Sequence, residues 1–337
     1  MLMTREEDGS HSVNVLNFPR AEDIRLETTR ARFTNILKRH GELTVRLSRD
    51  CDKTLFERLQ KEFDAVRVSQ TREIYLEGEQ WNDGLLATVR ERVHMEAERK
   101  TLQSRRDADA MLDHSIHEKC TYRAGNKIIC CLDGARIGIL YETSFAGEPC
   151  EVFHCVLESK SFLEKMTVLE HTIPFFLPIR EVENDYLSSN AMKFIDYVGD
   201  LLQAYVDRKE QVRLVKELYG NQIGELYFSL PHHMIEFVLA NFDCKITVNL
   251  RYADLLATLP CEVSVFAWPK RQTKKRRTSA LPVDQRDNGA TRSQLIPARL
   301  VPAEDALRTM SLPEAFAEIV LNMSEMLKDA FPMQTSA

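Results

Sequence analysis

The sequence predicts an α+β protein in which an N-terminal helical coiled coil is followed by two tandem modules, each a small antiparallel sheet closed by a helix. Three observations lead to this fold class. Proline is absent between Pro19 and Pro149, and much of that stretch has apolar residues at helical spacing. Short apolar and β-branched runs separated by turn residues follow it. The order of several strands and then one helix occurs twice.

The length and composition suit more than one domain. The chain has 337 residues, of which 44% are hydrophobic, enough for a packed core, and its net charge of −6 indicates no particular class of partner. No run approaches the roughly eighteen apolar residues of a membrane span, and the N-terminus lacks the apolar region of a signal peptide. We therefore expect an intracellular protein. Its expected parts are a disordered N-terminus (1–20), a helical region (21–115), and two modules (120–220 and 221–330).

The region 21–115 is predicted to be helical, with a coiled-coil seam. Its apolar residues recur three and four positions apart, with one slip of phase that resembles a stutter, and charges of both signs lie between them. We predict that this seam binds a partner, because a lone helix would leave it in water; a solvated helix without a partner is the alternative. The glycines of 76–84, LEGEQWNDG, make it the predicted break. The predicted partner-binding residues are Ile36, Leu43, Leu47, Leu55, Leu59, Phe63 and Val66.

The first module is predicted to be a four-stranded meander followed by one helix. The helix is amphipathic, with Asn190 as its expected cap and Gly220 as its expected stop. Its expected buried face comprises Phe194, Ile195, Val198, Leu201, Leu202 and Tyr205. The expected strands are 127–133, 136–143, 150–159 and 165–173, with turns containing glycine between the first three.

A loop with two prolines joins the last strand of this meander to the helix. Pro174 and Pro178 exclude a regular helix and a central strand over 173–179, because proline lacks an amide donor and restricts the residue before it. We therefore predict a rigid turn. We expect Phe175, Phe176 and Leu177 to pack under the sheet or against a neighbouring subunit.

The second module repeats this order. The segment 312–331 is the expected closing helix, with Ser311 as its cap and Pro313 in its first turn. Between the last strand and this helix, 270–305 is predicted to be a disordered insertion that is poor in large apolar residues. Its part from Lys270 to Arg292 has eight basic and two acidic residues, hence a charge of +6. The expected strands are 224–230, 234–241, 244–252 and 261–268.

Two segments resemble a known family. HTIPFFLPI, followed by FIDYVGDLLQAYVDRKEQ, and ITVNLRYADLLATLPCEVSV resemble the centromere protein O family of inner-kinetochore subunits. The resemblance covers roughly 128–268, with a weaker match at the closing helix. It implies tandem RWD modules behind an N-terminal coiled coil. Pro174-x-x-x-Pro178 fits the Tyr-Pro-x-x-x-Pro turn of RWD modules, but Ile173 stands in place of the tyrosine and the second module has no comparable turn.

The resemblance also implies a function. It indicates a non-catalytic structural subunit at the nuclear centromere, in the constitutive centromere-associated network, which supports kinetochore assembly and chromosome segregation. The implied partners are centromere protein P as a heterodimer, then centromere proteins Q and U, and in some lineages R. No cofactor, membrane or small-molecule substrate is expected.

The basic tract in the insertion suggests a further role. Clustered lysine and arginine serve as nuclear import signals or bind phosphate by counterion release, and a solvated run of charges is the alternative. A nucleic-acid-binding chromatin protein is therefore the competing function. A ubiquitin-pathway adaptor, argued from RWD analogy alone, is a third. The residues of the tract are Lys270, Arg271, Lys274, Lys275, Arg276 and Arg277.

The sequence offers weak signals for catalysis or metal binding. A ubiquitin-conjugating enzyme needs a nucleophilic cysteine after the sheet, and there is none between Pro178 and Gly220. Zinc-compatible spacings occur, but in a strand Cys155 would point away from the other two residues of its group. We expect buried free thiols and surface histidines instead, and no catalysis. The two groups are His114, His117 and Cys120, and Cys150, His154 and Cys155.

Overall fold

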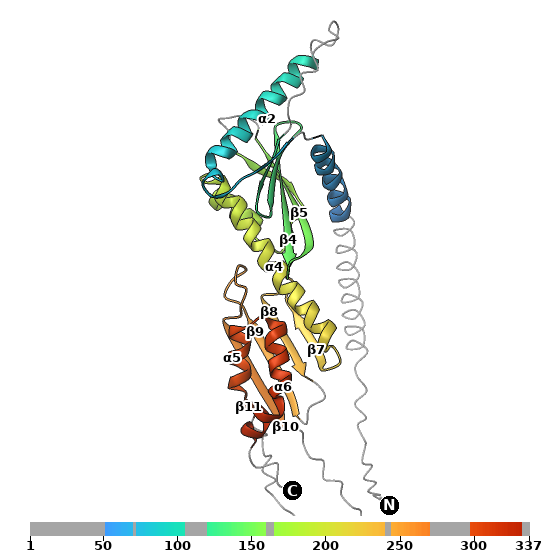
Figure 1. Cartoon of the computed structure of the whole chain (residues 1–337), viewed down its shortest axis with the longest axis vertical. Coiled ribbons are helices and arrows are strands. Elements are labelled where there is room, and N and C mark those ends of the chain that lie inside the picture. Colours follow the sequence, from blue (N-terminus) through green and yellow to red (C-terminus); the bar gives the residue numbers. More distant parts are fainter. Residues whose placement is uncertain are drawn as a thin grey trace, which may run out of the picture. The chain divides into compact units, whose positions relative to one another are not determined.

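The structure, a computed structural model, describes residues 51–69, 72–104, 120–159, 165–239, 244–269 and 297–331 (Figure 1). Its contacts divide the chain into two units, Met1–Arg58 and Leu59–Ala337. In the first unit the described residues 51–58 are helical, and the Thr54 hydroxyl donates a hydrogen bond to the carbonyl of Cys51 at 2.9 Å. The expected disordered N-terminus and most of the predicted coiled coil, with Ile36, Leu43 and Leu47, lie outside the described residues.

Within the described part of the second unit, the first sheet has six strands in the order β1-β2-β3-β4-β5-β6. Neighbouring strands are antiparallel, except for β1 and β2, which are parallel. The predicted meander is confirmed as β3 to β6. The strands are β1 (Arg72–Tyr75), β2 (Cys120–Ala124), β3 (Lys127–Leu132), β4 (Arg136–Phe145), β5 (Glu148–Glu158) and β6 (Thr167–His171).

Strand β1 shows that the region 21–115, most of which is predicted to be helical, also contains a strand. It pairs with β2, whose Arg123 donates a hydrogen bond from Nε to Oε1 of Glu73 at 2.8 Å. This bond is the largest influence on the Glu73 carboxyl and lowers its pKa. The predicted break at 76–84 is confirmed: a 3-10 turn, η1 (Gly78–Gln80), precedes helix α2 (Asp83–Ser104). A partner distant in the sequence therefore decides the state of this short segment.

One face of the first sheet packs against α4 (Ala191–Tyr219). The helix begins at its predicted cap, where the side chain of Asn190 accepts a hydrogen bond from the Lys193 amide at 2.7 Å, and Gly220 follows its last residue. All six residues of its predicted core-facing stripe are buried, which confirms that prediction. Between β6 and α4 the chain forms α3 (Ile179–Val182) and one π-helical turn, η2 (Glu183–Leu187).

The opposite face of this sheet is covered by the helical residues 59–68, in which Leu59, Phe63 and Val66 are buried. Phe63 lies so close to β4 that a Cβ on Gly138 would come within 2.7 Å of its ring. Its ring also packs edge-on against His154 of β5, with 4.9 Å between the ring centroids. The first sheet is therefore an inner layer, with helix 59–68 on one face and the core that α4 and α2 form on the other.

The second sheet has five antiparallel strands among the described residues, in the order β11-β10-β9-β8-β7. The four predicted strands are confirmed as β7 to β10. The insertion predicted at 270–305 is wrong at its C-terminal end, because β11 and the start of α5 lie there and bury Leu300, Ala303 and Glu304. The elements are β7 (Ile223–Phe228), β8 (Met234–Leu239), β9 (Cys244–Arg251), β10 (Glu262–Pro269), β11 (Ala298–Arg299), α5 (Val301–Thr309) and α6 (Leu312–Ala330).

The closing helix α6 begins as predicted. Ser311 and Glu314 form a reciprocal capping box, and Pro313 lies in the first turn. Phe316 and Ile319 of this helix are fully buried in a second core, together with the inward residues of β8, β9 and β10. Both the start and the packed face of α6 therefore follow from local sequence.

Helix α4 contributes to both cores. Its residues up to Val206 belong to the core under the first sheet, whereas Val212 and Val215 belong to the core under the second (Figure 1). Leu255 and Leu256, in the connection between β9 and β10, pack in return against the first core. The two modules thus share helix α4, and side chains from the connection between β9 and β10 of the second module pack against the core of the first.

The buried His154 makes the stability of the first module depend on pH. Burial lowers the pKa of its imidazole to about 4, whereas an unfolded histidine titrates near 6.5. Between these values the unfolded chain takes up a proton that the folded chain does not, so stability falls as pH decreases from about 6.5 to 4, by up to about 1.4 kcal/mol per pH unit.

Denaturant unfolding at several pH values measures this slope. We expect His154→Leu to have a shallower slope than the unmodified chain in that window, whatever its stability at neutral pH. Identical slopes in the two proteins would contradict the assignment.

Candidate protein-interaction surfaces

The loop with two prolines forms a tight turn. The amide of Leu177 donates a hydrogen bond to the carbonyl of Pro174 at 3.0 Å, and the Ile179 amide donates to the carbonyl of Leu177 at 2.8 Å. Ile173 and Leu177 are buried in the first core, on either side of the turn. The prolines therefore hold a short bend between two buried anchors.

The three apolar residues between the prolines differ in their exposure to solvent. Leu177 is buried, and Phe176 is half-buried with its ring edge-on to Tyr205, at 5.2 Å between centroids. Phe175 is 79% exposed. Leu177 thus packs under the sheet as expected. The burial of Phe175 stays a prediction, because it requires a second protein.

An aromatic row continues from this loop into the second module. Phe175 lies 5.5 Å from Phe176, and Tyr205 lies 6.0 Å from His232 in the turn between β7 and β8. His232 stacks on Phe228 of β7 at 4.5 Å. Both ends of the row are open to solvent, since Phe228 is 50% exposed. The row therefore places accessible aromatic groups from both modules on one connected surface.

Beneath the row, the fully buried Arg208 fastens α4 to the second module. Its Nε donates a hydrogen bond to the carbonyl of Pro231 at 3.3 Å, and its Nη1 donates to the carbonyls of Leu255 at 3.0 Å and Ala257 at 2.7 Å. The guanidinium lies 5.5 Å from the centre of the Tyr252 ring. Nη2 is buried without a hydrogen-bond acceptor among the described residues. Main-chain carbonyls and one aromatic ring thus surround this cation.

Burial lowers the pKa of Arg208, although the guanidinium stays protonated at any ordinary pH. A buried charge is tolerated only when hydrogen bonds replace its lost hydration, and the three carbonyls supply them here. Sequence reasoning missed this residue. The signal that could have found it was its place on the apolar stripe of α4, three positions after Tyr205 and four before Val212, where a charged residue is unusual.

The predicted partner-binding residues fall into two groups. Leu59, Phe63 and Val66 are buried against the chain's own first sheet, so the structure supplies their partner within the chain, and Leu55 is half-buried. The remaining three predicted residues lie outside the described part. The prediction that the seam binds another protein therefore now concerns its N-terminal half.

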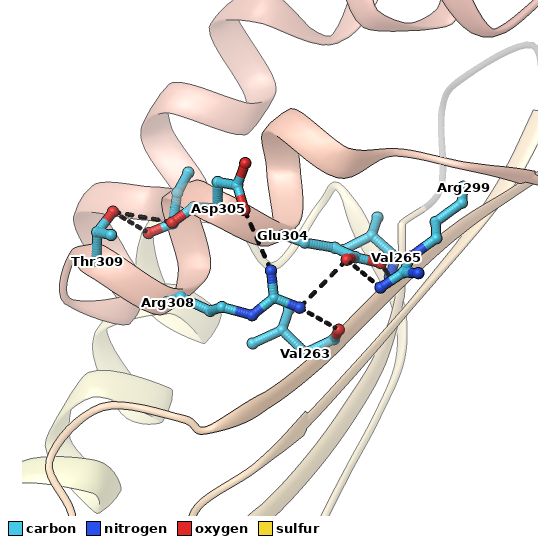
Figure 2. Close-up of polar contacts among 8 residues, drawn as sticks. Val263, Val265, Arg299, Glu304, Asp305, Arg308 and Thr309 are labelled. Carbon is cyan, nitrogen blue, oxygen red and sulfur yellow. Dashed lines mark hydrogen bonds and ion pairs between the residues drawn. The ribbon is translucent and has the colours of Figure 1, made fainter.

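The basic tract also lies outside the described residues, whereas the structure describes the segment that follows it, from residue 297 onward. There β11 pairs with β10, and Glu304 of α5 is buried beneath them (Figure 2). Oε1 of Glu304 accepts hydrogen bonds from the Val265 amide at 3.1 Å and from Nε of Arg299 at 2.7 Å. Arg308 donates from Nη2 to Oε2 of Glu304 at 3.3 Å and to the carbonyl of Val263 at 3.1 Å. One carboxylate thus joins α5 to the two strands.

Desolvation opposes the charge on Glu304, but the hydrogen bonds from Arg299 and the Val265 amide outweigh it, and the net result is a lowered pKa. The carboxylate is therefore ionised at neutral pH and holds the strand that follows the insertion against the sheet. The described residues on either side of 270–296 belong to β10 and β11, which are neighbouring strands at one edge of the second sheet.

The residues considered for zinc binding are separated in space. His154 faces helix 59–68, whereas Cys155 lies in the core on the other side of the sheet. Burial raises the pKa of the Cys155 thiol to about 12 and raises that of Cys130 as well, so both stay protonated. His114, His117 and the side chain of Cys120 lie outside the described part, and the described residues contain no cluster of three metal-ligating side chains. None of the helices described is long and apolar enough to span a bilayer.

Comparisons with known proteins show which family and which relatives this chain is similar to. A sequence profile of the family described as "Cenp-O kinetochore centromere component" matches residues 121–329. The chain is 26% identical over 132 residues to centromere protein O of Gallus gallus, and 29% identical over 105 residues to that of Homo sapiens. These matches cover 38% and 30% of this chain, and 40% and 35% of the relatives. They therefore span less than half the length of the relatives.

We expect Arg208→Ala to uncouple the two modules. The substitution leaves three buried carbonyls without their donor, which costs about 3–5 kcal/mol. The fluorescence of each of the two tryptophans reports the unfolding of one module, because Trp81 packs against the first core and Trp268 lies on β10. Single-tryptophan variants should unfold at one denaturant midpoint with Arg208 in place and at two midpoints without it.

Arg213→Ala is the matched control, because Arg213 lies on the same helix, is exposed, and has its ion pairs within the described residues with Glu210 and Glu217. It should leave the two midpoints coincident. Coincident midpoints in Arg208→Ala would contradict the coupling role.

Proposed function

The chain belongs to the Cenp-O kinetochore centromere component family, and on that basis we propose that it is a non-catalytic structural subunit of the inner kinetochore. The resemblance to the centromere protein O family is confirmed. The chain is thus a centromere and kinetochore component of the nucleus. The observation that carries the proposal is the extent of the family match, which runs from β2 to the last turn of α6 and so includes both sheets and α4.

We propose that both modules are RWD modules and that the chain assembles with centromere protein P as a heterodimer, and with centromere proteins Q, U and, in some lineages, R. Support comes from two successive sheets, each packed on a helix, and from the apolar positions Ile36, Leu43 and Leu47 upstream of them. In such an assembly the chain would support kinetochore assembly and chromosome segregation as a scaffold. Its buried Cys130 and Cys155 thiols are protonated and therefore offer no nucleophile.

The alternative of a nucleic-acid-binding chromatin protein is not favoured by the family match. We propose nuclear import as the role of the basic tract, with contact to DNA phosphates as a secondary one. A tract of this composition is a signal of the import type, and it contains no aromatic residue on which a base could stack.

Co-expression with the same organism's counterparts of centromere proteins P, Q and U tests the scaffold proposal. Replacement of Leu43 and Leu47 by aspartate should reduce recovery of the complex by about tenfold, because two charges would enter an apolar seam. We expect the two modules of the isolated chain to keep their unfolding midpoint.

Leu321→Asp is the control, because Leu321 is 79% exposed on α6 and lies outside the second core. A complex that forms equally well with all three chains would refute the seam as a partner site. Absence of any complex with the unmodified chain would refute the scaffold proposal itself.

Replacement of Lys274, Lys275, Arg276 and Arg277 by alanine separates the roles of the basic tract. If the tract is an import signal, nuclear accumulation falls, an unrelated import signal restores it, and recovery of the complex in vitro is unchanged. If the tract binds DNA, accumulation persists while the salt dependence of DNA binding becomes shallower, by up to about one unit for each phosphate that the variant no longer binds. Unchanged localisation and unchanged DNA affinity would mean that the tract is a solvated run of charges.

A further inference from the structure

The second sheet ends in a strand whose outer edge is open. In the described part of the chain, β7 pairs with β8 on one side and with no strand on the other. The strand at the opposite edge of the same sheet, β11, is only two residues long and lies beside the Glu304 network (Figure 2). The two edges therefore differ in their capacity to accept another strand.

The pairing with β8 shows which main-chain groups of β7 are free. The Ser229 amide donates to the Met234 carbonyl at 2.9 Å, and Tyr227 lies opposite Glu236. In an antiparallel pair, hydrogen-bonded positions alternate with positions whose amide and carbonyl point away. Leu226 and Phe228 occupy those alternate positions, so their amides and carbonyls point to the open edge. This edge presents two donors and two acceptors at the spacing of a strand.

Strand β7 lacks the usual features that protect an edge. Edge strands commonly avoid unwanted pairing by means of proline, several charges or a bulge within the exposed stretch. The sequence of β7, IGELYF, has no proline and one charged residue, Glu225. Its irregularity lies between Ile223 and Glu225, so the stretch from Glu225 to Phe228 keeps a regular register. A strand can therefore add along these four residues without distortion.

The side chains beside this edge define what would fit. Leu226 packs against the second core, so Glu225 and Tyr227 point to the opposite face of the sheet. Tyr227 is 60% exposed there and lines a groove of about 670 Å³ with Met234, Glu236 and Arg251. The face thus offers an accessible aromatic ring with a carboxylate on each side of it.

The two carboxylates beside Tyr227 are available to a cation. Neither Glu225 nor Glu236 has an ion pair among the described residues. Glu236 is the direct cross-strand neighbour of Tyr227, and Glu225 precedes Tyr227 by two positions on the same face. A strand paired with β7 would place alternate side chains next to Glu225 and Tyr227, at cross-strand distance. A basic residue and an apolar residue two positions apart meet both, in an order set by the direction in which the added strand runs.

We propose that β7 is a docking edge for an extended segment of another protein, which adds to the second sheet as a further strand. The segment pairs with the free groups of Leu226 and Phe228 and places a lysine or arginine beside Glu225 and an apolar side chain on Tyr227. Main-chain hydrogen bonds provide affinity in this mode of recognition, and alternate side chains provide specificity. The inference does not depend on the proposed kinetochore role.

Two synthetic ten-residue peptides serve as probes, one with the repeat Lys-Thr-Val-Thr and the other with the repeat Glu-Thr-Val-Thr, so that charged and apolar side chains alternate along one face of the added strand. We expect the full chain to bind the lysine peptide about tenfold more tightly, since like charges would face Glu225 and Glu236 in the other case. Hydrogen exchange of the Leu226 and Phe228 amides, which face no other strand in the described part of the chain, should slow by at least about tenfold in the complex.

Charge reversal supplies the stronger test. The double variant Glu225→Lys and Glu236→Lys should prefer the glutamate peptide, whereas Glu325→Lys, on the exposed side of α6, should behave as the unmodified chain. Equal affinities for the two peptides, or binding that leaves exchange at Leu226 and Phe228 unchanged, would overturn the proposal. Binding without slower exchange would mean that the peptide lies on the face of the sheet and not along its edge. A shift in preference with Glu325→Lys as well would overturn it too, since net charge alone would then explain the preference.

Discussion

The burial of Arg208 on the shared helix α4 is the constraint on which the arrangement of the two modules depends. No carboxylate of the described residues pairs with this guanidinium, so its hydrogen bonds go to main-chain carbonyls, which two separate connections of the second module supply. Those connections can meet the cation only if the second sheet approaches α4 in one orientation. The aromatic row from Phe175 to Phe228 lies over the same junction and depends on it.

The two sheets differ in how they are covered, and this difference bears on function. The first sheet lies between α4 and helix 59–68, with Phe63 in contact with Gly138 and His154. The second sheet has α5 and α6 on one face, whereas Tyr227, Met234 and Trp268 are partly exposed on the other. For a scaffold protein this places accessible apolar surface on the second module and at the junction.

The second module also shows how a long insertion can be accommodated. The chain leaves the sheet at Pro269 and is held again by 298–304, where Arg299 and Glu304 form paired hydrogen bonds. A buried, ionised carboxylate is stable here because two guanidinium groups and one amide satisfy it.

The sequence by itself determined the elements whose signals are local. The strands β3 to β10 and the helices α4 and α6 follow from apolar periodicity, and Asn190 and Ser311 cap their helices because a cap acts within one turn. Family membership was also accessible, because the proline loop and the residues around AYVDRK are distinctive. The tertiary structure alone decided the rest. β1 forms because β2 lies beside it, Leu59 and Phe63 are buried by the chain's own sheet, and Arg208 is internal because carbonyls distant in sequence surround it. In each case the deciding partner lies far along the chain, where local periodicity carries no information.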